Sequence, residues 1–351
     1  MAHQYAFAIG FRRKRGDQTL DVYFPKIYFN EQQPIVTTLC KKIPDHTFCQ
    51  TLTQEDLTLI EGKLPHASLF KSLLTQQHPY LTQDIVLFYL HQLDQPVATA
   101  EEGYFKLQLL SQRHVKPHGV SLDGIFGKLT NVAWTTSGPI LPEDMPEQRL
   151  KALASGQELS VSHVDKFPYL VNYHIPSGVR IASGSQVRLG AYLGEGTTVM
   201  PAGYINFNAG TLGNAMVEGR VSAGVFVGKN SDIGGGASIM GTLSGGNAHV
   251  ITIGEKCLLG ANSGTGISLG FGCTIAAGLY IYAGMKISLY NHEKEPVNLT
   301  GDRVSEGQNR VKAIDLSGRN HLLFIQDSQT GKVICMTNPK TIALNQELHQ
   351  N

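Results

Sequence analysis

An aliphatic residue recurs at almost every sixth position between residues 181 and 287, and this spacing constrains the fold more than any other feature of the chain. The residues at this spacing are Ile181, Val187, Leu193, Val199, Ile205, Val221, Val227, Ile233, Ile239, Ile253, Leu259, Leu269, Ile275, Ile281 and Ile287. Such a period matches neither a helical turn nor an amphipathic strand. It is typical of a parallel β-helix, in which short strands stack coil on coil and one apolar residue per hexad fills the interior. The glycines between these residues suit the tight corners. We therefore predict a mainly β protein built on a parallel β-helix.

The bulk composition limits the class of protein. With 351 residues, 42% of them hydrophobic, the chain can bury a large core and form more than one domain. Its 29 Lys and Arg nearly balance 28 Asp and Glu, which argues against a nucleic-acid partner. The five cysteines lack paired or metal-type spacing and predict reduced thiols. Basic residues 12–15 follow the short apolar start, the wrong order for a signal peptide, and no stretch is long enough to span a membrane. We expect a soluble cytoplasmic protein without a membrane partner.

The hexad rhythm also divides the chain into segments. We expect an N-terminal α+β domain over 1–115, a less regular connector over 116–177, the β-helix over 178–290 and a small C-terminal β/α extension over 291–351. The first domain could cap the open first coil, because an uncovered coil end invites edge-to-edge association.

Local patterns predict elements inside these segments. Thr53 is a candidate N-cap of a helix. The other expected elements are one or two strands over 22–29, helices over 85–90 and 103–113, a strand over 309–315, a hairpin over 321–336 and a short helix over 341–349.

The rhythm breaks over 206–220, 241–249 and 260–267, and each break is rich in Gly, Asn, Ser and Thr. Such segments can present backbone N–H groups to a ligand. Any one of them could equally be a plain corner or an inserted loop. Three breaks in one β-helix favour a shared site, because departures from a structural rule are where function is expected.

Glu218 and Arg220 lie in the first break, two positions apart, so an extended strand would point both to one face. They could form a surface ion pair. In a segment with no other charge, Glu218 could instead act as a general base or a nucleophile, and Arg220 could bind a carboxylate. His249 is the only histidine within the coils, which excludes a metal site of three histidines there. It could be a base or a solvated loop residue.

Several motifs resemble those of a known family. They cover residues 216–229, 231–246, 257–264 and 276–280, and the similarity extends outward through 115–120, 131–134, 164–168 and 206–211. Together they resemble the longer bacterial type of tetrahydrodipicolinate N-succinyltransferase. The resemblance covers the chain from about residue 105 to its C-terminal region.

The resemblance implies a homotrimer of left-handed β-helices with active sites between neighbouring subunits. The reaction would move succinyl from succinyl-CoA to tetrahydrodipicolinate, giving N-succinyl-2-amino-6-oxopimelate and CoA, in the diaminopimelate route to lysine. Glu218 would be the catalytic carboxylate, written in this family as forming an acyl anhydride, and Arg220 would hold a carboxylate of succinyl-CoA. The positions that match CoA contacts of the family are Gly235, Ser238, Ala261, Ala276, Ala277, Gly284, Lys312 and Ser328.

The sequence departs from the family in two places. Ser185 and Ala202 stand where relatives carry acidic ligands for magnesium ions, and neither side chain replaces a carboxylate for a hard cation. We therefore predict no metal site and no cofactor other than the co-substrate. An arginine-rich turn that helps to bind CoA reads Ile-Gln-Asp-Ser over 325–328 here, and the lost charge is expected to weaken CoA binding.

Some alternatives stay open at this point. Glu218 could serve as a base instead of forming an anhydride, since a carboxylate is a weak nucleophile. Arg180 and Arg188 could bind the substrate carboxylates or be surface charges. The chain could also be an acetyl- or other acyl-CoA transferase acting on a different amine, or a trimeric scaffold without activity.

Overall fold

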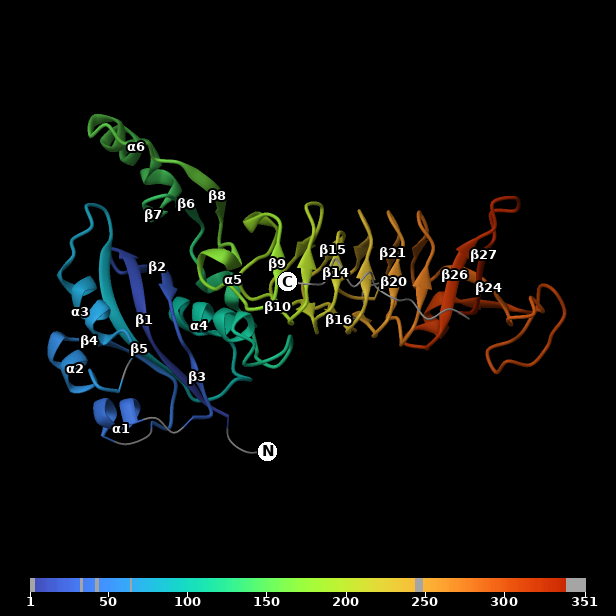
Figure 1. Ribbon diagram of the computed structural model, residues 1–351, viewed down its shortest axis with the longest axis horizontal. Helices are drawn as coiled ribbons and strands as arrows, with labels where there is room; N and C mark the ends of the chain where they lie inside the picture. The colour runs from blue at the N-terminus through green and yellow to red at the C-terminus, as the bar shows by residue number, and fades with distance from the viewer. Residues whose placement is uncertain (1–3, 32–33, 42–43, 64, 244–248, 339–351) are drawn as a thin grey trace. The chain divides into compact units, whose positions relative to one another are not determined.

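The computed structural model divides the chain into two compact units. The described residues are 4–31, 34–41, 44–63, 65–243 and 249–338. Unit 1 comprises Met1–Pro168 and Asn172–His174, and unit 2 comprises Tyr169–Val171 and Ile175–Asn351 (Figure 1). The expected segments 1–115 and 116–177 thus fall almost entirely in unit 1.

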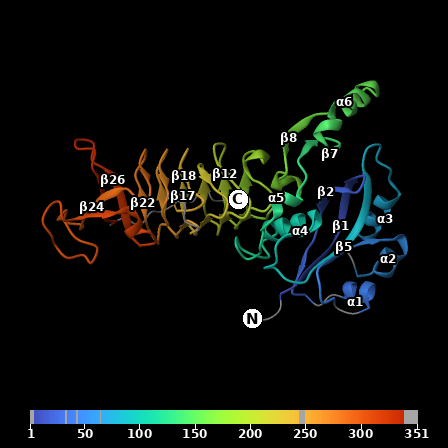
Figure 2. The same ribbon diagram turned by 180° about the vertical axis from the view of Figure 1, so that it is seen from behind.

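Unit 1 contains an antiparallel sheet in the order β2-β1-β5-β4, with β3 paired to β1. Its strands are β1 (Ala6–Arg15), β2 (Gln18–Tyr23), β3 (Tyr28–Phe29), β4 (Phe48–Leu52) and β5 (Thr82–Leu90). Its helices are α1 (Pro34–Cys40), α2 (Gln54–Leu59), α3 (Ala67–Thr75) and α4 (Ala100–Ser111). Helices α1–α3 lie on one face of the sheet and α4 on the other (Figures 1 and 2).

The prediction of a helix over 85–90 is wrong, because these residues form the end of β5. Ile85, Leu87 and Tyr89 pack in one core cluster with α1–α3. Phe88 faces the other way and contacts Phe105 of α4, with ring centroids 4.8 Å apart. A strand that is covered on both faces carries a continuous apolar run, which periodicity cannot separate from a buried helix.

The predicted cap at Thr53 is confirmed. Its Oγ1 accepts a hydrogen bond from the Asp56 backbone N–H at 3.1 Å, and the Asp56 carboxylate accepts one from the Thr53 N–H at 2.8 Å. Together they form the capping box at the start of α2.

The segment expected to be irregular contains a second sheet in the order β7-β6-β8. Its elements are α5 (Ile125–Lys128), β6 (Val132–Thr135), β7 (Gly138–Ile140), α6 (Met145–Ala154) and β8 (Val161–Asp165). Trp134 is held there by a hydrogen bond of 2.9 Å from its indole N–H to the backbone oxygen of Asp165.

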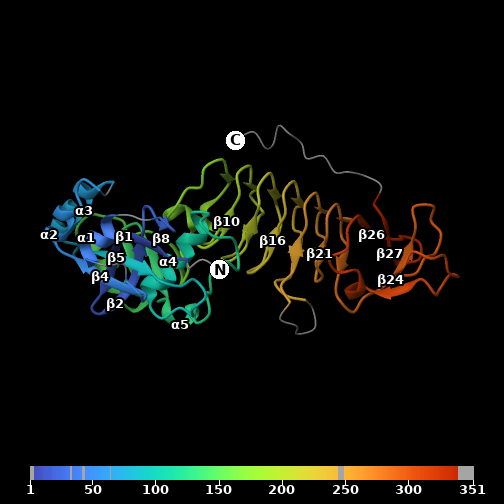
Figure 3. The same cartoon turned by 90° about the horizontal axis from the view of Figure 1, so that it is seen from below.

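Unit 2 is the predicted parallel β-helix, a stack of coils with two-residue strands on three faces (Figure 3). The first face consists of β9 (Arg180–Ile181), β11 (Thr198–Val199), β14 (Met216–Val217), β17 (Asp232–Ile233), β20 (Leu258–Leu259) and β22 (Thr274–Ile275). The second consists of β12 (Tyr204–Ile205), β15 (Arg220–Val221), β18 (Ser238–Ile239), β21 (Gly264–Thr265) and β23 (Tyr280–Ile281). The third consists of β10 (Tyr192–Leu193), β13 (Gly210–Thr211), β16 (Phe226–Val227) and β19 (Thr252–Ile253). The aliphatic residues of the hexads form the buried core.

Two of the three predicted breaks do not interrupt the stack. Thr211 and Thr265 occupy interior hexad positions and are fully buried. The Thr211 hydroxyl lies 2.6 Å from that of Thr197, and the Thr265 hydroxyl donates to the Ile267 backbone oxygen at 2.7 Å. What changes in each break is the spacing at one corner. Val221 follows Val217 after four positions instead of six, and Leu269 follows Thr265 at the same shortened spacing.

The remaining break is a true insertion between β18 and β19. Thr242 pairs with Val250 in an antiparallel bridge, and the Leu243 N–H donates to the His249 backbone oxygen at 2.9 Å. His249 is exposed.

Up to residue 338, where the described part ends, the chain after the coils forms the strands β24 (Lys286–Tyr290), β25 (Arg310–Lys312), β26 (Leu322–Gln326) and β27 (Val333–Thr337). The predicted hairpin is confirmed, because β26 and β27 pair antiparallel. The strand expected over 309–315 is shorter, since a 3-10 turn follows Lys312. The helix expected over 341–349 lies outside the described residues. Within the described ranges, no helix has the length and apolar character that a membrane crossing requires.

Candidate active site

Glu218 sits at the shortened corner between β14 and β15, where the backbone is tightly fixed. The N–H groups of Glu218 and Gly219 both donate to the Ile233 backbone oxygen, at 2.8 and 3.1 Å. The Arg220 N–H donates to the Ala237 oxygen at 2.7 Å. A Cβ atom on Gly219 would lie 2.3 Å from that same oxygen, so only glycine fits between the two coils. The corner therefore holds the Glu218 backbone in one position.

The Glu218 carboxylate lies against the same corner of the next coil. A Cβ atom on Gly235 would be 3.3 Å from Oε2 of Glu218. The Gly236 N–H donates to the Glu218 backbone oxygen at 3.3 Å. Glu218 is half-buried. The missing side chain of Gly235 thus leaves room beside the carboxylate for a small reacting group.

Arg220 points outward from the second face and contacts the next residue in the ladder. Its Nη2 donates to the Ser238 Oγ at 2.6 Å, and the two residues are register partners of β15 and β18. Among the described residues, no ion pair joins Arg220 to Glu218. The surface ion pair that the spacing allowed is therefore not formed, because Glu218 belongs to the corner and Arg220 to the strand.

Small residues continue this corner along the stack. The Asn262 N–H donates to the Gly235 oxygen at 2.8 Å, and the Gly278 N–H donates to the Ala261 oxygen at 2.9 Å. The corners at 218–219, 234–237, 260–263 and 276–279 are therefore stacked on one another, and we call this stack the Glu218 corner. The predicted site residues that the structure brings together on it and on the adjoining second face are Glu218, Arg220, Gly235, Ser238, Ala261, Ala276 and Ala277.

Comparison with known proteins decides the family. A model described as the middle part of tetrahydrodipicolinate N-succinyltransferase matches residues 129–169, and one described as the hexapeptide repeat of succinyl-transferase matches residues 250–283. A curated 2,3,4,5-tetrahydropyridine-2,6-dicarboxylate N-succinyltransferase from Pseudomonas paraeruginosa is 45% identical over 346 residues, covering 98% of this chain and 97% of that protein. This chain belongs to the tetrahydrodipicolinate N-succinyltransferase family. The resemblance of the motifs is confirmed.

Other members of the family agree. The protein of the same name from Vibrio cholerae is 53% identical over 269 residues, covering 77% of this chain and 75% of that protein. A solved structure from Campylobacter jejuni, assigned as a 2,3,4,5-tetrahydropyridine-2-carboxylate N-succinyltransferase, matches with a TM-score of 0.83 at 34% identity. That match covers 96% of this chain and 93% of the other.

Three residues that the family resemblance suggested lie away from the Glu218 corner. Gly284 is exposed in the turn between β23 and β24. Lys312 is in β25, opposite Lys286 of β24. Ser328 is exposed in the turn of the β26–β27 hairpin.

The positions of the family's magnesium ligands carry no acidic group here. Ser185 is exposed, with its Oγ 3.0 Å from that of Ser183, and Ala202 is exposed. The residues that the structure describes include no group of three or more His, Cys, Asp or Glu side chains that could hold a metal ion. Arg180 is exposed in β9, and Arg188 donates to the Asn206 Oδ1 at 3.3 Å.

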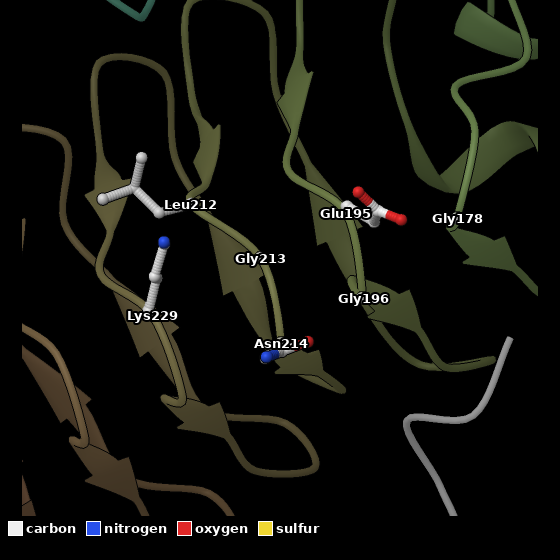
Figure 4. Close-up of a pocket in the computed structure, with 7 residues that line it drawn as sticks. All are labelled: Gly178, Glu195, Gly196, Leu212, Gly213, Asn214 and Lys229. Carbon is white, nitrogen blue, oxygen red and sulfur yellow. The ribbon is translucent and has the colours of Figure 1, made fainter.

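A separate hollow, which the sequence did not suggest, lies at the corner between the third and first faces (Figure 4). Its volume is about 410 Å³. It is lined by Gly178, Glu195, Gly196, Leu212, Gly213, Asn214 and Lys229. Figure 4 shows Glu195 and Lys229 on different coils. None of the predicted site residues lines this hollow, so it is distinct from the Glu218 corner.

Proposed function

We propose that the chain transfers succinyl from succinyl-CoA to tetrahydrodipicolinate. With the water that opens the ring, the products are N-succinyl-2-amino-6-oxopimelate and CoA, in the diaminopimelate route to lysine. Membership of the family supports this reaction. The observation that carries it is a half-buried carboxylate, Glu218, fixed at a two-residue corner next to an exposed guanidinium, Arg220.

Glu218 is the proposed catalytic residue. Acyl transfer to an amine needs a deprotonated amine and an oriented thioester. As a base, Glu218 would take the proton of the attacking amine. As a nucleophile, it would attack the thioester carbonyl and release the CoA thiolate, and the amine would then displace the carboxylate from the anhydride. The space beside Gly235 suits either role, because it leaves the carboxylate accessible from the corner.

Arg220 is proposed to bind the terminal carboxylate of the succinyl group. A guanidinium offers several N–H donors in one plane, which matches a carboxylate. The hydrogen bond to Ser238 orients it on the second face. The small residues Ala261, Ala276 and Ala277 would leave a path for the CoA arm along the Glu218 corner, while Gly284, Lys312 and Ser328 would contact more distant parts of CoA.

We further propose that the coils are left-handed and that three chains assemble with active sites between neighbours, as the family resemblance implies. The enzyme would work in the cytoplasm without a metal cofactor. Ser185 and Ala202 support the last point, because neither offers a carboxylate to a hard cation.

The test is CoA release by the purified protein with succinyl-CoA and tetrahydrodipicolinate. Glu218→Gln should lower kcat by about 100-fold or more, the usual contribution of a general base or its equivalent. Glu255→Gln makes the same change at an exposed position of another corner and should keep full activity. A burst of CoA release without the amine would favour the anhydride.

Other results would redirect the assignment. Full activity of a folded Glu218→Gln variant would remove Glu218 from the mechanism. Turnover with acetyl-CoA but not with succinyl-CoA would make the chain a different acyltransferase. No turnover with either acyl donor would favour a trimeric scaffold without activity.

A further inference from the structure

The second face carries an ordered column of outward side chains that extends beyond the proposed site. The ladder pairs Arg220 with Ser238, Ser238 with Gly264, and Gly264 with Tyr280. Residues paired in a parallel ladder point to the same side of the sheet, one strand spacing of about 4.8 Å apart. Tyr280 therefore lies on the same surface as the Arg220–Ser238 pair, two strands beyond Ser238.

The Tyr280 side chain leans along this column toward Ser238. A Cβ atom on Gly264 would lie 2.2 Å from Cε2 and 2.4 Å from Cδ2 of the Tyr280 ring. The ring thus occupies the space that any larger residue at Gly264 would fill. Because Gly264 stands between Tyr280 and Ser238, the phenol hydroxyl at the far end of the ring is directed to the Ser238 side. Tyr280 is half-buried, which leaves part of the side chain open to a ligand.

Three hydrogen-bonding groups therefore face one stretch of the second face. The Arg220 guanidinium and the Ser238 hydroxyl are already in contact at 2.6 Å. The phenol of Tyr280 approaches them from the opposite end across the bare Gly264. A guanidinium accompanied by hydroxyl donors is suited to a carboxylate, because every group in the set can donate to its oxygens. Glu218 lies two residues before Arg220, at the corner that adjoins this face.

We propose that Tyr280 is a specificity-determining residue that donates its hydroxyl hydrogen to the terminal carboxylate of the acyl group, on the side opposite Arg220. The enzyme would use this contact to favour a dicarboxylic acyl donor over an acetyl donor, which has no such carboxylate. The inference rests on the proposed function and deepens it, since it names the feature of the acyl group that this surface recognises.

Tyr280→Phe tests the contact, because it keeps the ring over Gly264 and removes only the hydroxyl. Loss of a hydrogen bond to a charged group should lower kcat/KM for succinyl-CoA by about 10- to 100-fold, mainly through KM. The slow rate with acetyl-CoA should not change. Tyr192→Phe, a half-buried tyrosine on the third face, is the matched control and should behave as wild type.

The binding of succinyl-CoA and acetyl-CoA to each variant, measured by calorimetry without the amine, separates this proposal from the proposed function. A wild-type preference for succinyl-CoA that Tyr280→Phe abolishes would support the role of Tyr280 even if no turnover occurred with tetrahydrodipicolinate. Equal losses with both acyl donors, or no loss with either, would overturn the proposal. Wild-type turnover with an unchanged Tyr280→Phe variant would leave the proposed function standing and remove Tyr280 from it.

Discussion

Replacing Gly219 by alanine should damage both the stability of the coil and the geometry of the site. The added Cβ would lie 2.3 Å from the Ala237 backbone oxygen and 2.9 Å from Cγ2 of Ile233. An ordinary contact is about 3.4 Å, so the two coils must separate locally by about 1.1 Å (3.4 − 2.3). Neither neighbour can yield easily, because one is backbone and the other belongs to the buried core.

The cost can be worked from the bonds that hold the corner. Overpacking a tight site costs about 1–3 kcal/mol. Weakening one or two of the backbone hydrogen bonds to Ile233 and Ala237 adds about 1 kcal/mol. We expect the free energy of unfolding to fall by roughly 2–4 kcal/mol in urea titrations followed by circular dichroism. Because Glu218 and Arg220 would move by about the same distance relative to Gly235 and Ser238 of the next coil, kcat/KM should fall by about 100-fold in the folded protein.

Gly127→Ala is the control for this substitution. Gly127 lies in α5, and a Cβ there meets no atom within 4 Å. Alanine is favoured over glycine in a helix, so this variant should be as stable as wild type and fully active. A Gly219→Ala protein within about 0.5 kcal/mol of wild type, with unchanged kcat/KM, would refute the reasoning, since it would mean that the corner relaxes freely.

Two further predictions concern unit 1. Burial raises the pKa of Glu101, but hydrogen bonds from groups that include Thr19 and Arg12 outweigh it and hold the pKa below its usual 4.5. This carboxylate should therefore contribute stability that is complete above pH 4.5 and is lost as the pH falls through the lowered value. In Glu101→Gln, the free energy of unfolding should therefore fall less steeply as the pH drops below 4.5. The same dependence on pH in the variant and in wild type would contradict the prediction. Thr53→Ala removes the Oγ1 that accepts a hydrogen bond from the Asp56 backbone N–H, and it should destabilise the start of α2 by about 1 kcal/mol. Faster exchange of the amide hydrogens in α2 would show this loss, and unchanged exchange there would contradict the prediction.

The hexads and the site motif were readable in the sequence because they are local. One aliphatic side chain per hexad is enough to fill a β-helix, so Val199, Val227 and Ile233 could be placed in the core without coordinates. Glu218 and Arg220 could be singled out because they are charges in an otherwise uncharged, glycine-rich stretch. The prediction of a helix over 85–90 is wrong because the two buried faces of this strand depend on helices from distant parts of unit 1.

Thr211 and Thr265 lie in segments that the sequence predicts as breaks, although both side chains are buried in the interior of the coils. A polar residue at a hexad position looks like a break in the sequence, but inside the coil the Thr211 hydroxyl meets that of Thr197, and the Thr265 hydroxyl donates to the Ile267 backbone oxygen. Thr197 comes 14 positions before Thr211, so only the coiled chain brings these two hydroxyls together.

The sequence by itself determined that unit 2 is a parallel β-helix and that Glu218 and Arg220 are its exceptional charges, because periodicity and local charge do not depend on distant contacts. The tertiary structure alone decided that Glu218 lies against Gly235, that Arg220 bonds to Ser238, and that Tyr280 leans across Gly264. These contacts join residues about one coil apart, 16 to 18 positions along the chain. The Glu218–Gly235 and Gly264–Tyr280 contacts each span one shortened corner of four residues, whereas Arg220 and Ser238 lie three full hexads apart. Each register becomes fixed only when one coil rests on the next.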